Sequence, residues 1–153
     1  MRGMTSNMLE IREAAKEDLK QLLELYTQLN DNVMPEFDGR LEGIWNKILS
    51  DSDHHIIVGS IGGRIISTCV IVIIPNLTRG QRPYALVENV VTDKAHRGKG
   101  YATQLLDHAK QIAVKEGCYK IALMTGSKEE STLNFYRQAG YNSIDKTAFI
   151  QWL

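Results

Sequence analysis

One short segment combines glycines, basic residues and a helix start in a way that suits anion binding. It runs from Arg97 to Ala102 with the sequence RGKGYA, between an apolar run that ends near Thr92 and a helical pattern that begins near Gly100. Glycines let backbone N–H groups gather around an anion, and the first turn of a helix offers unpaired N–H groups at the positive end of its dipole. The segment is predicted to bind a phosphate or pyrophosphate. A strand-to-helix turn without a ligand is the alternative that the loop alone leaves open.

Two common nucleotide loops do not match this segment. The P-loop pattern GxxxxGK[ST] does not occur in the sequence. The dinucleotide fingerprint GxGxxG/A fails because Thr103 stands where the third glycine belongs. That fingerprint also needs an acidic residue near the end of the next strand, where this chain has Met124 and Thr125. Neither nucleotide loop is predicted.

Helical and extended patterns alternate around the loop. Apolar residues on one helical face predict helices over 17–30, 41–49, 100–116 and 129–139. Alternating or β-branched runs predict strands over 8–12, 55–60, 64–74, 84–92 and 119–124, with one or two closing strands over 141–153. Gly62-Gly63 predicts a tight hairpin between the second and third strands.

This order of elements indicates an α+β fold, that is, a mixed α/β arrangement in one domain over residues 1–153. An antiparallel first half followed by a strand–helix–strand crossover is not typical of a doubly wound sheet. The length of 153 residues suits one domain, and the sequence contains no repeat or linker.

Composition excludes several classes of partner. Lys plus Arg and Asp plus Glu both total 18, so no net charge favours nucleic acid or an anionic membrane, and neither partner is predicted. No apolar run approaches the ~20 residues of a membrane span. The polar start at 1–8 lacks the apolar core of a signal peptide, which predicts a cytoplasmic protein.

Three segments resemble the GCN5-related N-acetyltransferase (GNAT) superfamily. Its signature, Arg/Gln-x-x-Gly-x-Gly/Ala after a strand, is matched by Arg97, Gly100 and Ala102. Residues 87–93 (VENVVTD) resemble the fourth strand of the family, and residues 133–141 (LNFYRQAGY) resemble its final helix motif FYxxxGF. The segments follow the order of the family, whereas the N-terminal half agrees only in its order of elements.

The resemblance implies a mostly antiparallel sheet that is flanked by helices and splays between its fourth and fifth strands to admit acetyl-coenzyme A. The backbone of Val90, Val91 and Thr92 would bond the pantetheine arm. Asn134 is a further candidate for coenzyme contact, although a solvent-facing helix position is equally consistent with the pattern. The pyrophosphate would be bound by Arg97, Gly98, Lys99, Gly100, Tyr101, Ala102 and Thr103.

The implied reaction is transfer of the acetyl group to a primary amine by direct attack in a ternary complex. An amine with a pKa of about 10 is only about a thousandth neutral at pH 7, so it must lose a proton first. Glu88 is the candidate base, directly or through water, with a surface strand residue as the alternative. A backbone N–H near Val90, freed by a strand bulge, would stabilise the oxyanion. Tyr136 would protonate the departing thiolate or act only as a core tyrosine.

Three positions were considered for coenzyme contact or metal binding, and neither role is favoured at them. Glu129 stands where many relatives have an asparagine that contacts the coenzyme, and an acid near phosphates is unfavourable unless it points away. His54 and His55 are adjacent on a predicted strand, so they point to opposite faces, and no cysteine or carboxylate pair completes a site. No metal is predicted.

The acceptor remains open among small-molecule amines. Residues 117–121 resemble the corresponding stretch of glucosamine-6-phosphate N-acetyltransferases, and Arg79 and Arg82 are candidates to meet an anionic acceptor unless they are simply solvated. A protein or peptide amine is one alternative acceptor. A noncatalytic acyl-coenzyme A-binding domain is a rival that Tyr136 and the intact loop disfavour. Relatives are commonly dimers, so the resemblance also allows a homodimer.

Overall fold

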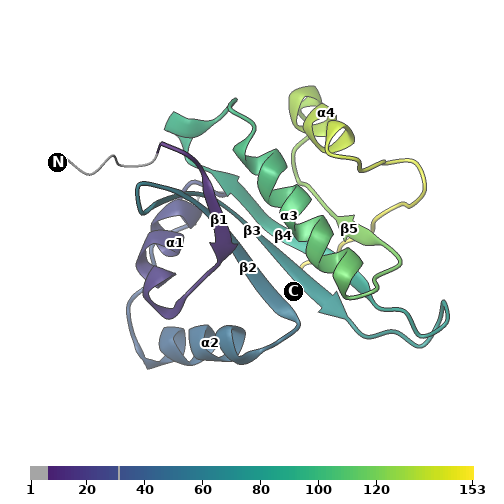
Figure 1. Cartoon of the computed structure of the whole chain (residues 1–153), viewed down its shortest axis with the longest axis horizontal. Helices are drawn as coiled ribbons and strands as arrows, with labels where there is room; N and C mark the ends of the chain where they lie inside the picture. Colours follow the sequence, from purple (N-terminus) through teal and green to yellow (C-terminus); the bar gives the residue numbers. More distant parts are fainter. Residues whose placement is uncertain (1–6, 31) are drawn as a thin grey trace.

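A five-stranded sheet forms the centre of the computed structural model, which describes residues 7–30 and 32–153. The strands lie in chain order (Figure 1): β1 (Glu10–Glu13), β2 (His54–Ile61), β3 (Arg64–Ile74), β4 (Tyr84–Thr92) and β5 (Ile121–Leu123). The first four strands pair antiparallel, and β5 pairs parallel with β4. The predicted mixed α+β fold is confirmed.

Helices cover both faces of this sheet. They are α1 (Leu19–Tyr26), α2 (Gly39–Ser50), α3 (Tyr101–Lys115) and α4 (Glu130–Gln138), with 3₁₀ turns at Lys16–Asp18 and Lys94–His96. Helices α1 and α2 pack on one face through Leu22, Leu25 and Trp45, whereas α3 packs on the other through Leu105 and Leu106. We call these the α1/α2 face and the α3 face.

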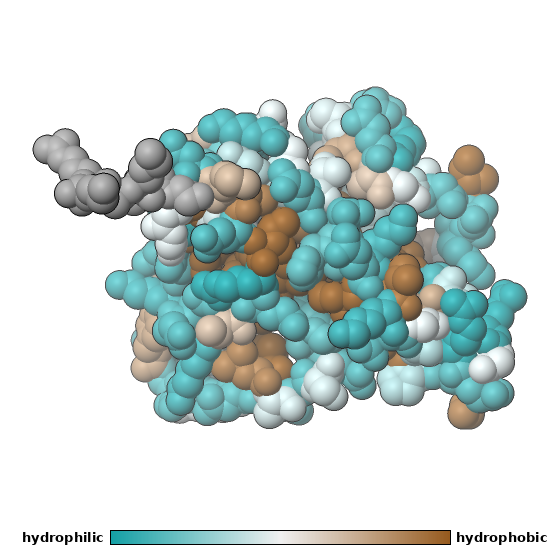
Figure 2. Space-filling model, viewed as in Figure 1, coloured by the Kyte–Doolittle hydropathy of each residue, from teal (hydrophilic) through white to brown (hydrophobic). Residues whose placement is uncertain are grey.

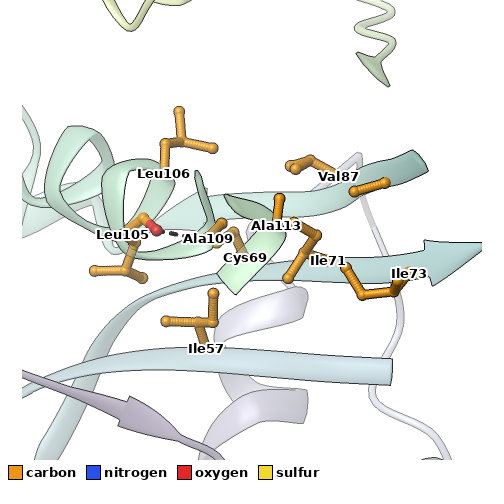
Figure 3. Packing of buried hydrophobic residues seen from close by; sticks show 10 residues of the cluster. Ile57, Cys69, Ile71, Ile73, Val87, Leu105, Leu106, Ala109 and Ala113 are labelled. Carbon is orange, nitrogen blue, oxygen red and sulfur yellow. Dashed lines mark hydrogen bonds between the residues drawn. The ribbon is translucent and has the colours of Figure 1, made fainter. Parts of the chain in front are cut away.

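The core on the α3 face depends on small helix residues. Ala109 and Ala113 of α3 are 0% and 2% exposed, and they bring the helix close to Ile57 and Ile71 of the sheet. Figure 3 shows these side chains converging, with the thiol of Cys69 directed at the carbonyl of Leu105. Burial raises the pKa of Cys69 to about 12, so this thiol stays protonated and behaves as a core residue.

The β2–β3 hairpin turns as the sequence predicts. Gly62 and Gly63 have φ of 56° and 82°. Positive φ at both central residues defines the tight turn whose twist suits a two-residue hairpin, and glycine adopts it without a steric cost.

A bulge interrupts β4 where the resemblance places it. Val70 pairs with Glu88 and Thr68 pairs with Val91, so Asn89 and Val90 together lie opposite one residue of β3. Asn89 has φ of 51°, a left-handed conformation that asparagine tolerates better than most residues. The extra residue also turns the following side chains, so that Val90 packs with the α3 face and Val91 with the α1/α2 face.

Strands β4 and β5 part after a short contact. Their last aligned pair is Val87 with Leu123, and β4 continues to Thr92 without a β5 partner. The splay predicted between the fourth and fifth strands is therefore present. It opens on the side where the loop before α3 begins.

Two boundary predictions were wrong. The first helix was expected over 17–30, but a 3₁₀ turn precedes it and α1 ends at Tyr26. Its start is shifted because the Asp18 side chain accepts the N–H of Ala15 at 2.7 Å. The closing strands expected over 141–153 are absent from the described structure, in which these residues pair with no strand. None of the described helices is sufficiently long and apolar to span a bilayer.

Candidate active site

The glycine loop is open where a ligand must approach. Gly98 and Gly100 have φ of 75° and 80°, and a Cβ added at either would meet no heavy atom within 4 Å. Glycine is therefore required here by backbone conformation rather than by crowding. The space in front of the loop is left free.

Unpaired N–H groups of α3 point toward this loop. The first helical hydrogen bond runs from the N–H of Gln104 to the carbonyl of Gly100 at 3.2 Å, so Tyr101, Ala102 and Thr103 occupy the first turn, whose N–H groups lack acceptors within the helix. The Arg97 Nε donates to the carbonyl of Thr92 at 2.9 Å, which ties the loop to the end of β4. These donors suit a pyrophosphate.

A side-chain network that the sequence did not reveal anchors the loop to the turn that follows α1. Gln28 donates from Nε2 to Asp93 at 2.8 Å and accepts the N–H of Lys94 at 2.9 Å. Asp93 also contacts the His96 ring at 2.8 Å. The Gln28 hydrogen bond, followed by that of His96, lowers the pKa of the Asp93 carboxyl. Gln28 is 65 positions from Asp93, too far for any local pattern to connect them.

Tyr136 lies at the other side of the splay. It belongs to α4, where its ring lies edge-on to Phe135 at 5.0 Å and to Tyr141 at 6.3 Å. Burial is the main cause that raises the pKa of Tyr136, followed by electrostatic interactions with Cys69 and Glu88. The hydroxyl therefore keeps its proton throughout neutral pH and is a possible proton donor.

Glu88 is exposed and lies beside the β4 bulge. The Glu88 carboxylate, on β4, contributes to the raised pKa of Tyr136 on α4. Glu88 and the bulge thus lie on the part of β4 that has no β5 partner, and the glycine loop follows the end of this strand. A proton acceptor, a proton donor and an anion-binding loop suit acyl transfer.

Comparison with known proteins agrees with this geometry. The model of the Acetyltransferase (GNAT) family matches residues 11–141. The chain belongs to this family. It is therefore an acyltransferase of the kind that uses acetyl-coenzyme A as co-substrate.

Several proteins that are similar to this GNAT acetyltransferase are themselves acetyltransferases by name. The glucosamine 6-phosphate N-acetyltransferase of Trypanosoma brucei brucei is 29% identical over 148 residues, covering 90% of this chain and 92% of the relative. A putative acetyltransferase from Agrobacterium tumefaciens has a similar structure, with a TM-score of 0.87 and 34% identity over 94% of this chain and 99% of its own. The glucosamine-6-phosphate N-acetyltransferase of Arabidopsis thaliana, at 23% identity, shares the fold with a TM-score of 0.83 over 95% of this chain and 98% of its own.

Asn134, a candidate for coenzyme contact, lies on α4, and Glu129, where such contact was doubted, immediately precedes this helix. Asn134 is exposed and its Oδ1 accepts from Arg137 at 3.0 Å, an arrangement along the helix surface. Glu129 is also exposed at the helix start, where its backbone carbonyl, rather than its carboxylate, accepts the N–H groups of Thr132 and Leu133. Coenzyme contact by Asn134 stays a prediction.

Arg79 and Arg82, in the loop between β3 and β4, both contact other residues of the chain. Arg82 donates to the carbonyls of Gly117 and Cys118 at 3.1 and 3.0 Å, just after the end of α3. Arg79 lies over the ring of Tyr119, 5.6 Å from its centre. Arg82 therefore has a clear structural role, and Arg79 retains more freedom to meet an acceptor.

His54 and His55 lie at the start of β2. His55 pairs through Nδ1 with Glu13, and both His54 and His55 border a hollow of about 230 Å³. Within residues 7–30 and 32–153, no group of three His, Cys, Asp or Glu side chains is arranged to bind a metal ion.

Proposed function

We propose that this GNAT acetyltransferase transfers the acetyl group of acetyl-coenzyme A to a primary amine of a small molecule, by direct attack in a ternary complex. The parting of β4 from β5 after Val87, directly beside the open loop at Gly98 and Gly100, carries the proposal. The unpaired part of β4 leads along the chain from Glu88 to this loop, which supports the proposal.

The coenzyme would lie along this unpaired part of β4. The unpaired side of β4 at Val90, Val91 and Thr92 offers backbone groups to the pantetheine arm. Its pyrophosphate would meet the N–H groups from Gly98 to Thr103 together with the charges of Arg97 and Lys99, and Asn134 would make a lesser contact. The bound coenzyme supplies the reactive acetyl thioester.

Residues of the chain would then accept a proton from the amine, stabilise the negative charge of the intermediate and donate a proton to the leaving sulfur. Glu88, exposed at the bulge, would take the amine proton directly or through a water molecule. The N–H at Val90 would stabilise negative charge on the acetyl oxygen, because the bulge removes this residue from regular pairing with β3. Tyr136 would donate the proton of its hydroxyl to the leaving sulfur.

An amino-sugar phosphate is the first acceptor to test. This choice is supported by the name of the Trypanosoma brucei brucei relative, a glucosamine 6-phosphate N-acetyltransferase. Arg79, whose guanidinium stacks on Tyr119 without a hydrogen bond in the described structure, is the better of the two loop arginines to reach an anionic group. Arg82 would contribute by holding the loop in place.

The decisive experiment offers acetyl-coenzyme A with a panel of amines and measures free thiol. The panel contains glucosamine 6-phosphate, other amino sugars, polyamines, aminoglycosides and a lysine peptide. Rapid thiol release with a small amine supports the proposal. Release only with the peptide assigns a protein amine as acceptor, and coenzyme binding without release from any amine assigns a noncatalytic domain. We propose further that the protein is cytoplasmic, that it needs neither nucleic acid nor a membrane, and that it forms a homodimer.

A further inference from the structure

Strands β4 and β5 form a wedge that closes at one pair of residues. They pair in parallel from Ala85 with Ile121 to Val87 with Leu123, and beyond this pair β4 continues to Thr92 whereas β5 ends. The glycine loop follows the far end of β4, so a coenzyme whose pyrophosphate lies at the loop enters the wedge from its open side. Its acyl group, at the other end of the coenzyme, is then the part that lies deepest. We call Val87 and Leu123 the apex of the wedge.

The apex is apolar and turned toward the interior. Val87 is 1% exposed and belongs to the core cluster on the α3 face, and Leu123 is half-buried against the same cluster. Phe135 and Tyr136 of α4 also pack on this cluster. Figure 2 shows hydrophobic residues only in separate patches among hydrophilic ones on the viewed face of the molecule, as expected when most apolar side chains are turned inward. The lining of the apex therefore suits a hydrocarbon chain rather than a charged group.

The catalytic groups leave one direction for the acyl chain. Glu88 pairs with Val70, which belongs to the α1/α2 face, so the amine whose proton Glu88 takes approaches from that face. In the transfer, the amine nitrogen bonds to the acyl carbon, and the carbon–sulfur bond breaks with its electron pair leaving on sulfur. The amine proton passes to Glu88, the Tyr136 proton passes to sulfur, and the acyl oxygen faces the N–H of Val90. The rest of the acyl group must therefore extend away from the α1/α2 face, toward the apex.

The distance to the apex limits the length of this chain. Val90 is three residues beyond Val87, which is about 10 Å along a regular strand and less across the bulge. An acetyl group bonded to the Val90 N–H takes up its own length and an apolar contact of about 4 Å on its way to Leu123. Little of the span is then left for additional methylenes.

We propose that Leu123, at the apex of the β4–β5 wedge, determines the length of the acyl group that the enzyme transfers and selects acetyl over longer chains. This inference rests on the proposed acetyl transfer and adds the residue that selects the donor. A shorter side chain at this position opens space for a longer acyl group, because a truncated core residue leaves a cavity that its surroundings fill only in part. An apolar pocket discriminates by about 10 to 200-fold for each methylene.

Binding of acyl-coenzymes in the absence of an amine tests the role of Leu123 without turnover. Calorimetry compares acetyl-coenzyme A, butyryl-coenzyme A and coenzyme A itself. The unaltered chain should bind butyryl-coenzyme A at least about tenfold more weakly than acetyl-coenzyme A. Leu123→Ala should remove this difference and leave the affinity for coenzyme A, which has no acyl group, unchanged. Leu123→Val, a smaller truncation, should give an intermediate ratio and keeps the test valid if the alanine variant does not fold.

Ile121→Ala is the matched control for both variants. Ile121 lies on the same strand, is also half-buried and packs against the same cluster, but it pairs with Ala85 two residues before the apex. Its truncation should cost comparable stability and leave the ratio of the two acyl-coenzyme affinities unchanged. The ratio of kcat/KM for the two donors, measured with an amine that the unaltered enzyme acetylates, should follow the same pattern, because a loss of stability alone lowers both values together.

Three results would overturn the inference. Equal affinity of the unaltered chain for the two acyl-coenzymes would show that the apex imposes no limit. An unchanged ratio in folded Leu123→Ala and Leu123→Val, or an equal change in Ile121→Ala, would place the limit elsewhere. Both of these results leave the proposed function intact. Failure of the unaltered chain to bind coenzyme A itself would overturn the proposed function and this inference with it.

Discussion

At the scale of single residues, the site separates groups that act on protons from groups that only hold conformation. Tyr136 is a possible donor because burial raises the pKa of its hydroxyl. Gly98 and Gly100 contribute no side chain, and their value lies in backbone conformations that most residues avoid. Each role predicts a different kinetic or binding defect.

Removal of the Tyr136 hydroxyl should slow turnover. We expect Tyr136→Phe to lower kcat by ~10 to 1,000-fold with little change in coenzyme affinity, because the ring and its packing remain. A thiolate leaves without protonation more easily as the pH approaches the pKa of a coenzyme thiol, so the defect should shrink toward pH ~8.5. Turnover from pH 6 to 9 with the true amine measures this effect.

Tyr141→Phe is the matched control for that experiment. It removes a hydroxyl from the ring edge-on to Tyr136, where burial raises the pKa of Tyr141 to about 12. Its kcat should stay near that of the unaltered enzyme. If both variants keep full kcat throughout the pH range, Tyr136 is only a packing residue.

Gly100→Glu should abolish coenzyme binding while leaving the fold intact. The change places a carboxylate beside the expected pyrophosphate and a side chain on a backbone with φ of 80°. Gly63→Glu is the control, since Gly63 has φ of 82° and equally open surroundings in the β2–β3 hairpin. Calorimetry should show lost affinity only for Gly100→Glu. Equal affinity in the two folded variants would place the pyrophosphate elsewhere.

At the scale of elements, local signals predicted turns well and distant contacts poorly. Gly62-Gly63 identified its hairpin because two adjacent residues determine that turn. The bulge at Asn89 could be expected only through resemblance, since it depends on pairing with β3. The Gln28–Asp93 contact was missed because no sequence pattern links residues 65 positions apart. The sequence therefore predicts elements and the loop, but not the side chains that connect them.

That connection between the turn after α1 and the loop should matter for coenzyme binding. We expect Gln28→Ala to raise the coenzyme KM about tenfold with a smaller effect on kcat, because the loop loses a charge-assisted hydrogen bond worth ~1.5–3 kcal/mol. Gln21→Ala is the control, since Gln21, on α1, also accepts a distant backbone N–H, that of Ile65, at 2.8 Å. It should reduce stability without changing KM. Identical KM values in both variants would show that the contact is only structural.

The same contact has a consequence at acid pH. The pKa of Asp93 is lowered in the folded protein, so its stabilising contribution is present above the unfolded value of about 3.9 and disappears as the pH falls through the lower folded value. Gln28→Ala should weaken that contribution and so lose less stability between pH 5 and pH 3. Urea unfolding of both proteins at several pH values in that range measures how much stability each loses. A steeper loss in the variant would contradict the assignment.

At the scale of the whole molecule, one expectation from the sequence was wrong in an informative way. Apolar residues over 141–153 predicted closing strands, but a strand needs a neighbour and hydrophobic patterning does not say where that neighbour is. In the described structure residues 141–153 pair with no strand.

Coenzyme binding should stabilise the whole fold, because the loop, β4 and α4 come from distant parts of one sheet-centred structure. A ligand that binds only the native state contributes about 2.7 kcal/mol at 100 times its Kd. For a chain of this length each kcal/mol raises Tm by ~2–4 °C, so acetyl-coenzyme A with micromolar affinity should raise Tm by ~5–10 °C at submillimolar concentration. Scanning calorimetry measures the shift, and Gly100→Glu provides a folded control that should show none. Because a dimer's Tm also depends on protein concentration, the comparison must be made at one fixed concentration. An unchanged Tm with millimolar coenzyme would contradict binding at the β4–α3 loop, and an equal shift in Gly100→Glu would move the site away from it.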